Sequence, residues 1–159
     1  TPEVAEDVLV RGDADLVSMA RPMLADSQFV AKARDGKANE INTCIACNQA
    51  CLDHTFTGQE VSCLVNPRAC HETVLRPQPV IEPKHIVIVG AGPAGLSYAV
   101  TAAERGHRVS VYEARDEIGG QFNLAKRIPG KEEFEETIRY YQVMMQKYHQ
   151  FGRLYKKPQ

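Results

Sequence analysis

Four cysteines crowd into one short stretch of this chain, and a glycine-rich motif follows them. Cys44, Cys47, Cys51 and Cys63 have the spacing C-x2-C-x3-C-x11-C, and residues 89–95 then read Val-Gly-Ala-Gly-Pro-Ala-Gly. Thiolates are soft ligands that suit iron–sulfur clusters or zinc. A thiolate site placed directly before a dinucleotide-binding turn predicts electron transfer between a metal cluster and a bound nucleotide cofactor.

Size and charge exclude several classes of protein. The 159 residues suit one ordinary domain or two truncated ones, and a net charge of -1 offers no field that would attract a polyanion. We therefore expect no nucleic-acid partner. No apolar run approaches the roughly 18 residues of a membrane span, and the start lacks the basic and apolar blocks of a signal peptide, which predicts a cytoplasmic protein with no membrane contact.

The cysteine count favours a metal site over disulfides. Five is an odd number, and four of the cysteines share one window, which suits a metal site in a reducing compartment. The chain begins without Met and ends at Gln159 without a finishing element. These ends predict a fragment of a longer protein, and nothing in the sequence indicates its oligomeric state.

The first 41 residues have the pattern of an α/β protein. A helix is expected over 3–11 and a buried strand over 14–20. Pro22 suits the first turn of a new helix, and Ser27 is a candidate cap for another that ends before Gly36. Helix, strand and helix in this order are typical of a parallel sheet.

Residues 42–84 show no sustained periodicity of either kind, and prolines interrupt them. An irregular segment of this length needs something else to organise it, and a metal cluster could do so. The end of the segment, residues 75–83, reads as an extended linker between domains.

Residues 85–159 begin as a dinucleotide-binding domain. A strand, a helix ended by Gly106 and a second strand are expected over 85–89, 93–105 and 108–113. A covering helix is expected over 131–148, whereas residues 149–157 lack the pattern of a third strand. The predicted apolar stripe of this covering helix consists of Phe134, Ile138, Tyr141, Met145 and Tyr148.

The cysteine spacing favours an iron–sulfur cluster over zinc, with disulfides behind both. Structural zinc sites usually combine two C-x2-C pairs or pairs of Cys and His, whereas here a triplet precedes a lone fourth cysteine. We expect Cys70 to be a small buried hydrophobic residue. His54 and His71 could each bind zinc, but we expect them to be surface imidazoles or hydrogen-bond donors behind the ligands, not metal ligands. Arg68 is expected to be exposed.

Each glycine of the turn has a predicted role. Gly90 permits the tight turn, Gly92 lets the backbone approach a pyrophosphate, and Gly95 lets the helix pack closely on the strand. Glu113 ends the second strand near the offset at which a carboxylate binds ribose hydroxyls, which favours FAD or NAD over NADP. Gly120, with its neighbour Gly119, is either part of a simple loop or a second close approach to the cofactor.

Taken together, these segments resemble the iron–sulfur flavoenzymes that join a barrel of the old yellow enzyme type to a dinucleotide-binding domain. Within that family the resemblance is greatest to the bacterial NADPH-dependent 2,4-dienoyl-CoA reductases and more distant to trimethylamine dehydrogenase. The residues that carry the resemblance are 13–22, 40–51, 62–72, 89–95, 117–121 and 128–134.

The resemblance implies a fold and a set of cofactors. Residues 1–41 would be the last βα unit of an FMN-binding (β/α)8 barrel, 42–84 the iron–sulfur segment, and 85–159 the first βαβ part of a Rossmann-like FAD domain. The four cysteines would bind a 4Fe–4S cluster, the turn and Glu113 would bind FAD, and Ala20 and Arg21 would contact the FMN phosphate.

The same resemblance implies an activity for the longer protein. Electrons would pass from NADPH to FAD, then through the cluster to FMN and an unsaturated acyl-CoA, a step of fatty acid β-oxidation. The family's catalytic tyrosine and histidine lie outside these residues, so the chain has no catalytic residue of its own and is expected to be inactive alone. Two alternatives are an electron-transfer module of a related amine dehydrogenase or enone reductase, and a zinc-stabilised interaction domain.

Overall fold

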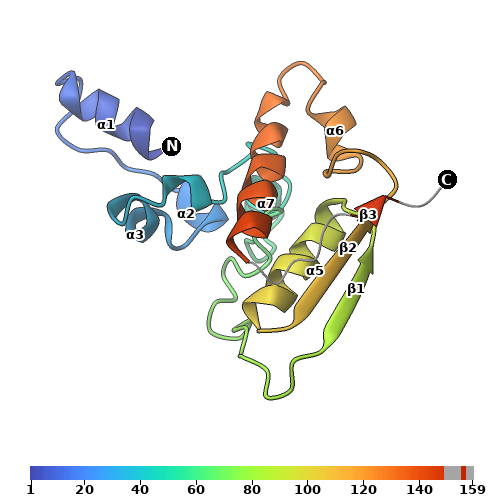
Figure 1. Cartoon of the computed structure of the whole chain (residues 1–159). Coiled ribbons are helices and arrows are strands. Elements are labelled where there is room, and N and C mark those ends of the chain that lie inside the picture. The colour runs from blue at the N-terminus through green and yellow to red at the C-terminus, as the bar shows by residue number, and fades with distance from the viewer. Residues whose placement is uncertain (149–154, 157–159) are drawn as a thin grey trace. The chain divides into compact units, whose positions relative to one another are not determined.

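The computed structural model describes residues 1–148 and 155–156 of the chain, which divides into two compact units (Figure 1). The first unit comprises Thr1–Leu75 and the second Arg76–Gln159. The first contains α1 (Pro2–Val10), α2 (Arg21–Ala25), α3 (Phe29–Arg34), η1 (Ala38–Glu40) and α4 (Leu52–Phe56). The second contains β1 (His85–Val89), α5 (Pro93–Glu104), β2 (Arg108–Glu113), α6 (Phe122–Ala125), η2 (Glu132–Phe134), α7 (Glu135–Lys147) and β3 (Tyr155–Lys156).

Short helices and irregular chain make up the first unit, and its core is small. Pro22 lies in the first turn of α2 as predicted, and the helix expected over 3–11 corresponds to α1, which buries none of its residues. The buried hydrophobic side chains of the unit are those of Ala25, Phe29, Ile41, Ile45 and Ala69. With so little apolar surface buried, polar contacts must hold much of this unit together.

Two local predictions for the first unit are wrong. Residues 14–20 do not form a strand, and Leu16 in that segment is 89% exposed. A parallel strand needs a hydrogen-bonded neighbour, and none lies beside this segment in the part of the chain that the structure describes. Ser27 does not cap α3, because the Asp26 carboxylate instead accepts the Gln28 N–H at 2.9 Å just before that helix.

The second unit is built on a parallel sheet in the order β1-β2-β3. Both predicted strands are present, with Ile86 opposite Val109 and Ile88 opposite Val111. The prediction that residues 149–157 form no strand is wrong at Tyr155–Lys156, because these two residues pair with the end of β2. Residues 149–154 and 157 lie outside the described part of the chain. Pairing with a strand distant in sequence, rather than local pattern, defines this two-residue strand.

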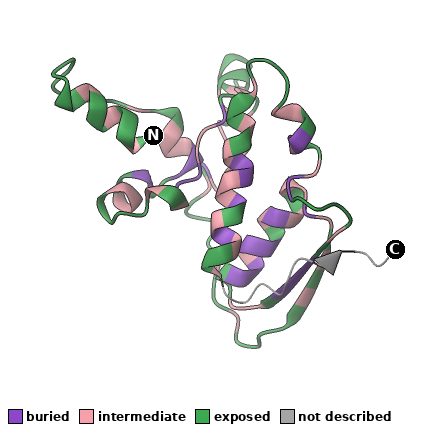
Figure 2. Ribbon diagram, turned by 45° about the horizontal axis from the view of Figure 1, so that its top comes forward, coloured by how far each residue is buried: buried purple, intermediate pink, exposed green. Residues whose placement is uncertain are grey.

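Helices α5 and α7 supply the covering layer of the second unit's core, and buried residues gather on them and on β2 (Figure 2). Leu96 of α5 and Val109 and Val111 of β2 are almost wholly buried, each contributing about 1.5–3 kcal/mol of hydrophobic stabilisation. Ile138 and Tyr141 of the predicted stripe are buried, but Met144 is buried in place of the predicted Met145. None of the helices within 1–148 is long and apolar enough to cross a membrane.

Gly95 is where α5 and β1 approach each other most closely. A Cβ atom at this position would lie 2.1 Å from the carbonyl oxygen of Gly90 and 3.3 Å from Ile88 Cγ2. Real Cβ atoms do not come so close to backbone oxygens, so any side chain here must push the helix away from the strand. The absence of a side chain at Gly95 therefore sets the position of the helix on the sheet.

We predict that Gly95→Ala destabilises the second unit by about 2–3 kcal/mol, because the new methyl group must displace α5 from the Gly90 carbonyl. Hydrogen exchange at the β2 amides, followed by mass spectrometry or NMR, measures the change. Gly92→Ala is the matched control, since a Cβ there meets nothing within 4 Å. Equal exchange rates in the two variants would contradict the packing role of Gly95.

Candidate functional site

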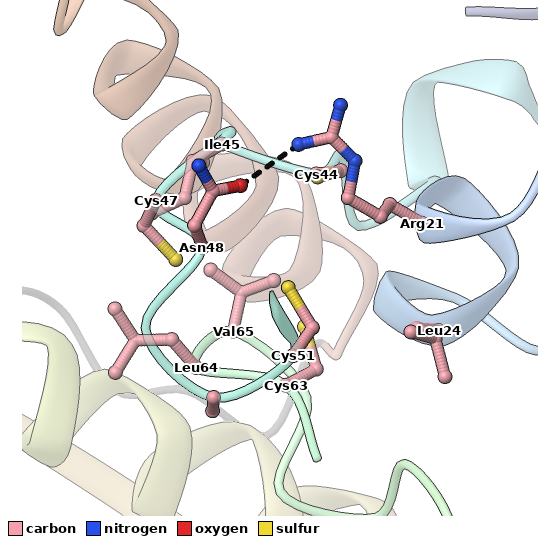
Figure 3. Close-up of a pocket in the computed structure, with 11 residues that line it drawn as sticks. Arg21, Leu24, Cys44, Ile45, Cys47, Asn48, Cys51, Cys63, Leu64 and Val65 are labelled. Carbon is pink, nitrogen blue, oxygen red and sulfur yellow. Dashed lines mark hydrogen bonds between the residues drawn. The ribbon is translucent and has the colours of Figure 1, made fainter. Parts of the chain in front are cut away.

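All four predicted ligand cysteines line one pocket of the first unit (Figure 3). Cys44, Cys47 and Cys51 come from the loop before α4, and Cys63 comes from the irregular segment after it. The other lining residues are Arg21, Leu24, Ile45, Asn48, Ala50, Leu64 and Val65. None of the five cysteines forms a disulfide, and the four in the pocket are half-buried.

Backbone geometry brings the two cysteine segments together. Ala46 and Asn48 have φ values of 52° and 62°, so the chain turns through the left-handed region twice between Cys44 and Cys51. The Ser62 N–H then donates to the carbonyl of Ala50 at 2.7 Å. This bond places the residues that precede Cys51 and Cys63 side by side.

Electrostatics around Cys63 show that the thiols share one environment. Burial raises the pKa of the Cys63 thiol, hydrogen bonds from the Val65 and Asn66 backbone lower it, and Cys44 and Cys47 raise it through charge repulsion. A thiol with these neighbours stays protonated more readily than a free one, until a metal displaces the proton. The backbone donors then favour the thiolate that a metal requires.

The donor set of the pocket fits an iron–sulfur cluster or zinc. Four free thiols are the ligands that both prefer, and Leu24, Ile45 and Val65 provide an apolar surround that limits water access. Among residues 1–148 and 155–156, no three His, Cys, Asp or Glu side chains are already arranged around the position of a single ion. The chemistry of the ligands, rather than a finished coordination geometry, therefore defines the site.

The structure places Arg21 at this pocket, whereas the sequence resemblance assigned it with Ala20 to an FMN phosphate. Its guanidinium Nη1 donates to Asn48 Oδ1 at 2.9 Å, across a separation of 27 residues (Figure 3). Ala20 lies just before α2 and is exposed. Sequence reasoning missed Asn48; the available signal was an asparagine, a residue type that tolerates the left-handed backbone seen here, placed between two of the cysteines.

The remaining candidates lie outside the pocket lining. Cys70 is exposed, so the prediction that it is buried is wrong; it has a φ of 64° in the turn that follows buried Ala69. His54 Nδ1 lies 2.8 Å from the Glu60 carbonyl oxygen, and His71 Nδ1 lies 3.8 Å from Glu60 Oε1. Arg68, which was expected to be exposed, is half-buried.

The glycine turn of the second unit has the backbone conformation of a nucleotide-binding loop. Gly90 has a φ of 98°, and its N–H donates to the Tyr112 carbonyl at 2.7 Å, which joins the turn to β2. Gly92 is the N-cap of α5, and a Cβ atom added to it would meet nothing within 4 Å. Free backbone N–H groups at the start of a helix are suited to bind an anion such as a pyrophosphate.

Glu113 reaches back from the end of β2 to the turn. Its Oε2 accepts the Ala91 N–H at 2.7 Å and its Oε1 accepts the Arg115 N–H at 3.0 Å. These two bonds hold the pKa of the carboxyl below its ordinary value. The carboxylate therefore stabilises the turn itself and retains lone pairs that can accept ribose hydroxyls.

Gly119 and Gly120 form a second loop that packs on the turn. The Gly119 N–H donates to the Ala91 carbonyl at 2.7 Å, and a Cβ on Gly120 would lie 3.1 Å from Gly92 Cα. Asn123, which the sequence analysis overlooked, is buried and donates through Nδ2 to the Ile118 carbonyl at 2.8 Å. The second loop therefore approaches the backbone of the turn closely at Gly120, and the approach of Gly120 to a cofactor stays a prediction.

Comparisons with known proteins agree with this geometry. Residues 88–157 match the family model of an NAD(P)-binding Rossmann-like domain. The chain is 46% identical over 134 residues to a metal reductase of Desulforamulus reducens, and the match covers 84% of this chain and 20% of that protein. It is 42% identical over 134 residues to an NADH oxidase of Thermoanaerobacter brockii, covering 82% and 20%.

Solved structures extend the likeness over almost the whole chain. A structure of 2-naphthoyl-CoA reductase with 2-naphthoyl-CoA superposes with a TM-score of 0.95 at 36% identity, covering 99% of this chain and 24% of that one. Dimethylamine dehydrogenase and histamine dehydrogenase also match. The chain thus spans about a fifth to a quarter of the length of these relatives.

The relatives define a class of protein. They are reductases, an oxidase and dehydrogenases, so the expected relation to oxidoreductases is confirmed. The expected α/β fold with a Rossmann-like nucleotide-binding domain is confirmed as well.

We predict that Glu113→Gln makes the stability of the second unit less dependent on acid. Because the pKa of the folded carboxyl lies below its ordinary value of 4.5, its contribution is complete above that value and is lost as the pH falls through the folded pKa. Glutamine cannot ionise, so the unfolding free energy of the variant should change less between roughly pH 5 and pH 3.

Urea unfolding followed by circular dichroism at several pH values measures this difference. Glu117→Gln is the control, because Glu117 is an exposed carboxylate in the loop that follows. A pH dependence of the Glu113 variant that matches the wild type would show that the bonds to Ala91 and Arg115 contribute nothing to stability.

Proposed function

We propose that this chain is a segment of a flavin and iron–sulfur oxidoreductase in which the four pocket cysteines bind a 4Fe–4S cluster. The observation that carries the proposal is that Cys63 lines the same pocket as Cys44, Cys47 and Cys51, although the short helix α4 separates it from them in sequence. The homology to oxidoreductases supports it independently. A bound cluster would supply one-electron transfer between two flavins.

Residues around the cysteines would tune this centre. The backbone N–H groups of Val65 and Asn66 donate to Cys63, and hydrogen bonds to cluster sulfurs raise the reduction potential. The positive charge of Arg21 lies at the rim of the same pocket, where it also favours the reduced, more negative state. The apolar side chains of Leu24 and Ile45 limit access of water.

The second unit would bind the adenosine diphosphate part of FAD. Gly92 and the N-terminus of α5 would receive the pyrophosphate, and Glu113 would accept hydrogen bonds from the ribose hydroxyls. A carboxylate at the ribose repels a 2'-phosphate, which favours FAD over NADP at this turn. Gly120 would let the backbone of the second loop come close to the same cofactor.

For the longer protein we propose the reaction of the family that the sequence resembles most. It would reduce an unsaturated acyl-CoA in the cytoplasm with electrons from NADPH, by way of FAD, the cluster and FMN. Residues 1–41, 42–84 and 85–159 would be the barrel end, the cluster segment and the start of the FAD domain, with Ala20 and Arg21 at the FMN phosphate. The solved structure of a reductase that acts on an aromatic acyl-CoA supports a thioester substrate.

A second candidate is a segment of an amine dehydrogenase. The matches to dimethylamine dehydrogenase and histamine dehydrogenase favour it, and the residues described here would have the same roles in electron transfer. A zinc-stabilised interaction domain is the third candidate, because four thiolates also suit zinc. Metal analysis separates this last candidate from the other two.

We predict that the chain purified without oxygen contains iron and acid-labile sulfide and absorbs broadly in the visible range. Cys47→Ser should remove most of this absorption, because one thiolate ligand of four is lost. Cys70→Ser is the matched control, since Cys70 is exposed and does not line the pocket. Zinc in place of iron, or an unchanged spectrum of Cys47→Ser, would refute the assignment.

We also predict that Gly92→Ala weakens FAD binding by about tenfold or more, which corresponds to 1.4 kcal/mol, because its methyl group occupies the space that a pyrophosphate needs. Quenching of flavin fluorescence on titration of the protein measures the affinity. Unchanged hydrogen exchange in β2 would show that the loss is local to the turn. Wild-type affinity in this variant would contradict binding at Gly92.

A further inference from the structure

A buried carboxylate of the first unit contacts the segment that leads into the cysteines. Asp26 is 6% exposed, and its Oδ2 accepts the backbone N–H of Asn42 at 2.9 Å, two residues before Cys44. The same oxygen accepts Lys32 Nζ at 2.5 Å, while Oδ1 accepts the Gln28 N–H. The carboxylate is therefore satisfied on both oxygens, as a buried charge must be.

Lys32 completes the charge pair and adds a third contact. Its side chain is 21% exposed, and Nζ also donates to the Glu40 carbonyl at 3.0 Å. Helix α3 is thereby joined to η1 and to the start of the cysteine segment. Loss of the Lys32 charge would leave the buried Asp26 carboxylate without its counter-charge, and loss of the Asp26 charge would leave the half-buried Lys32 ammonium without a carboxylate; either loss destabilises a structure more than loss of an exposed pair.

Asn42 links the two cysteine segments to each other. Its backbone binds Asp26, and its side-chain Nδ2 donates to the Val65 carbonyl at 2.8 Å, two residues after Cys63. Asn42 is 8% exposed, so this hydrogen bond is sheltered from water. One residue thus holds the chain before Cys44 against the chain after Cys63.

Asn66 supplies the third link. Its Nδ2 donates to the Leu24 carbonyl in α2 at 2.8 Å, and its backbone N–H donates to the Cys63 carbonyl at 3.2 Å. Helix α2, the segment before Cys44 and the segment after Cys63 are therefore joined by side-chain hydrogen bonds that involve no sulfur atom. These side-chain hydrogen bonds form the frame of the cysteine pocket.

We propose that Asp26, Lys32, Asn42 and Asn66 are positioning residues that hold the two cysteine segments together before the metal centre is bound. The role of these residues in retaining a cluster rests on the proposed function, whereas the hydrogen bonds themselves do not. Closing an irregular loop on its first segment costs conformational entropy, which metal binding would otherwise have to offset. A preformed frame removes that cost and so strengthens retention of the centre.

Asp26→Asn tests the frame, because it keeps the shape of the side chain and removes the charge that Lys32 requires. In the metal-free, reduced chain we expect exchange of the Asn42, Ser62 and Asn66 amides to accelerate about tenfold or more, while the β2 amides are unchanged. Asp35→Asn is the matched control, because Asp35 pairs with Arg34 on the surface, where the two side chains are 46% and 75% exposed.

Asn42→Ala provides a second test that leaves the Asp26–Lys32 pair intact and removes only the bond to Val65. After reconstitution with iron and sulfide, both variants should lose iron to a chelator about tenfold faster than the wild type and Asp35→Asn. Unchanged exchange in Asn42→Ala would overturn the frame, even if Asp26→Asn fails to fold. Faster exchange with an unchanged rate of iron loss would show that the frame does not help to retain the cluster.

The two proposals fail separately. If the wild-type chain binds no iron or sulfide, the proposed function fails, and the exchange measurements on the metal-free chain still decide whether the frame exists. If the wild-type chain binds a cluster and the variants retain it equally well, the proposed function stands and the positioning role is refuted.

Discussion

The hydrogen bond from the Asn42 side chain to the Val65 carbonyl joins the segment before Cys44 to the segment after Cys63, and the proposed frame of the cysteine pocket rests on it. The first unit buries few large apolar side chains, so it cannot rely on hydrophobic packing to bring distant segments together. A buried polar network fulfils this task, because each of its bonds has a defined direction and is costly to break away from water. Four thiols consequently share one pocket although the chain around them is irregular.

In the second unit, close packing around the glycine turn positions the nucleotide-binding residues. Gly95 lets α5 lie against β1, Gly90 turns the chain, and the Glu113 carboxylate holds the Ala91 amide. The loop at Gly119 then packs on the same turn through the Ala91 carbonyl. The nucleotide site is therefore formed by backbone groups and by glycines that lack side chains, and not by a set of reactive side chains.

Some of this organisation could be predicted from the sequence because it is local. The β1-α5-β2 unit follows from periodicity and from glycines whose spacing leaves few alternatives. The strand prediction for residues 14–20 is wrong because an apolar run forms a strand only where a neighbouring strand can pair with it. The prediction that Cys70 is buried is wrong because its exposure depends on the turn that follows Ala69 and not on the apolar character of its side chain. The contacts of Arg21 and Asn42 span 27 and 23 residues, and no periodic pattern records them.

The sequence by itself determined the types of groups available for chemistry, namely four thiols of the kind that binds soft metals and a glycine turn of the kind that binds nucleotides, because ligand type and turn conformation depend on residue identity and spacing. Tertiary structure alone decided which side chains surround those groups. Arg21 reaches Asn48 across 27 residues of sequence, and Asp26 reaches Asn42 across 16. Such contacts depend on how the segments pack in three dimensions, which spacing along the chain does not encode.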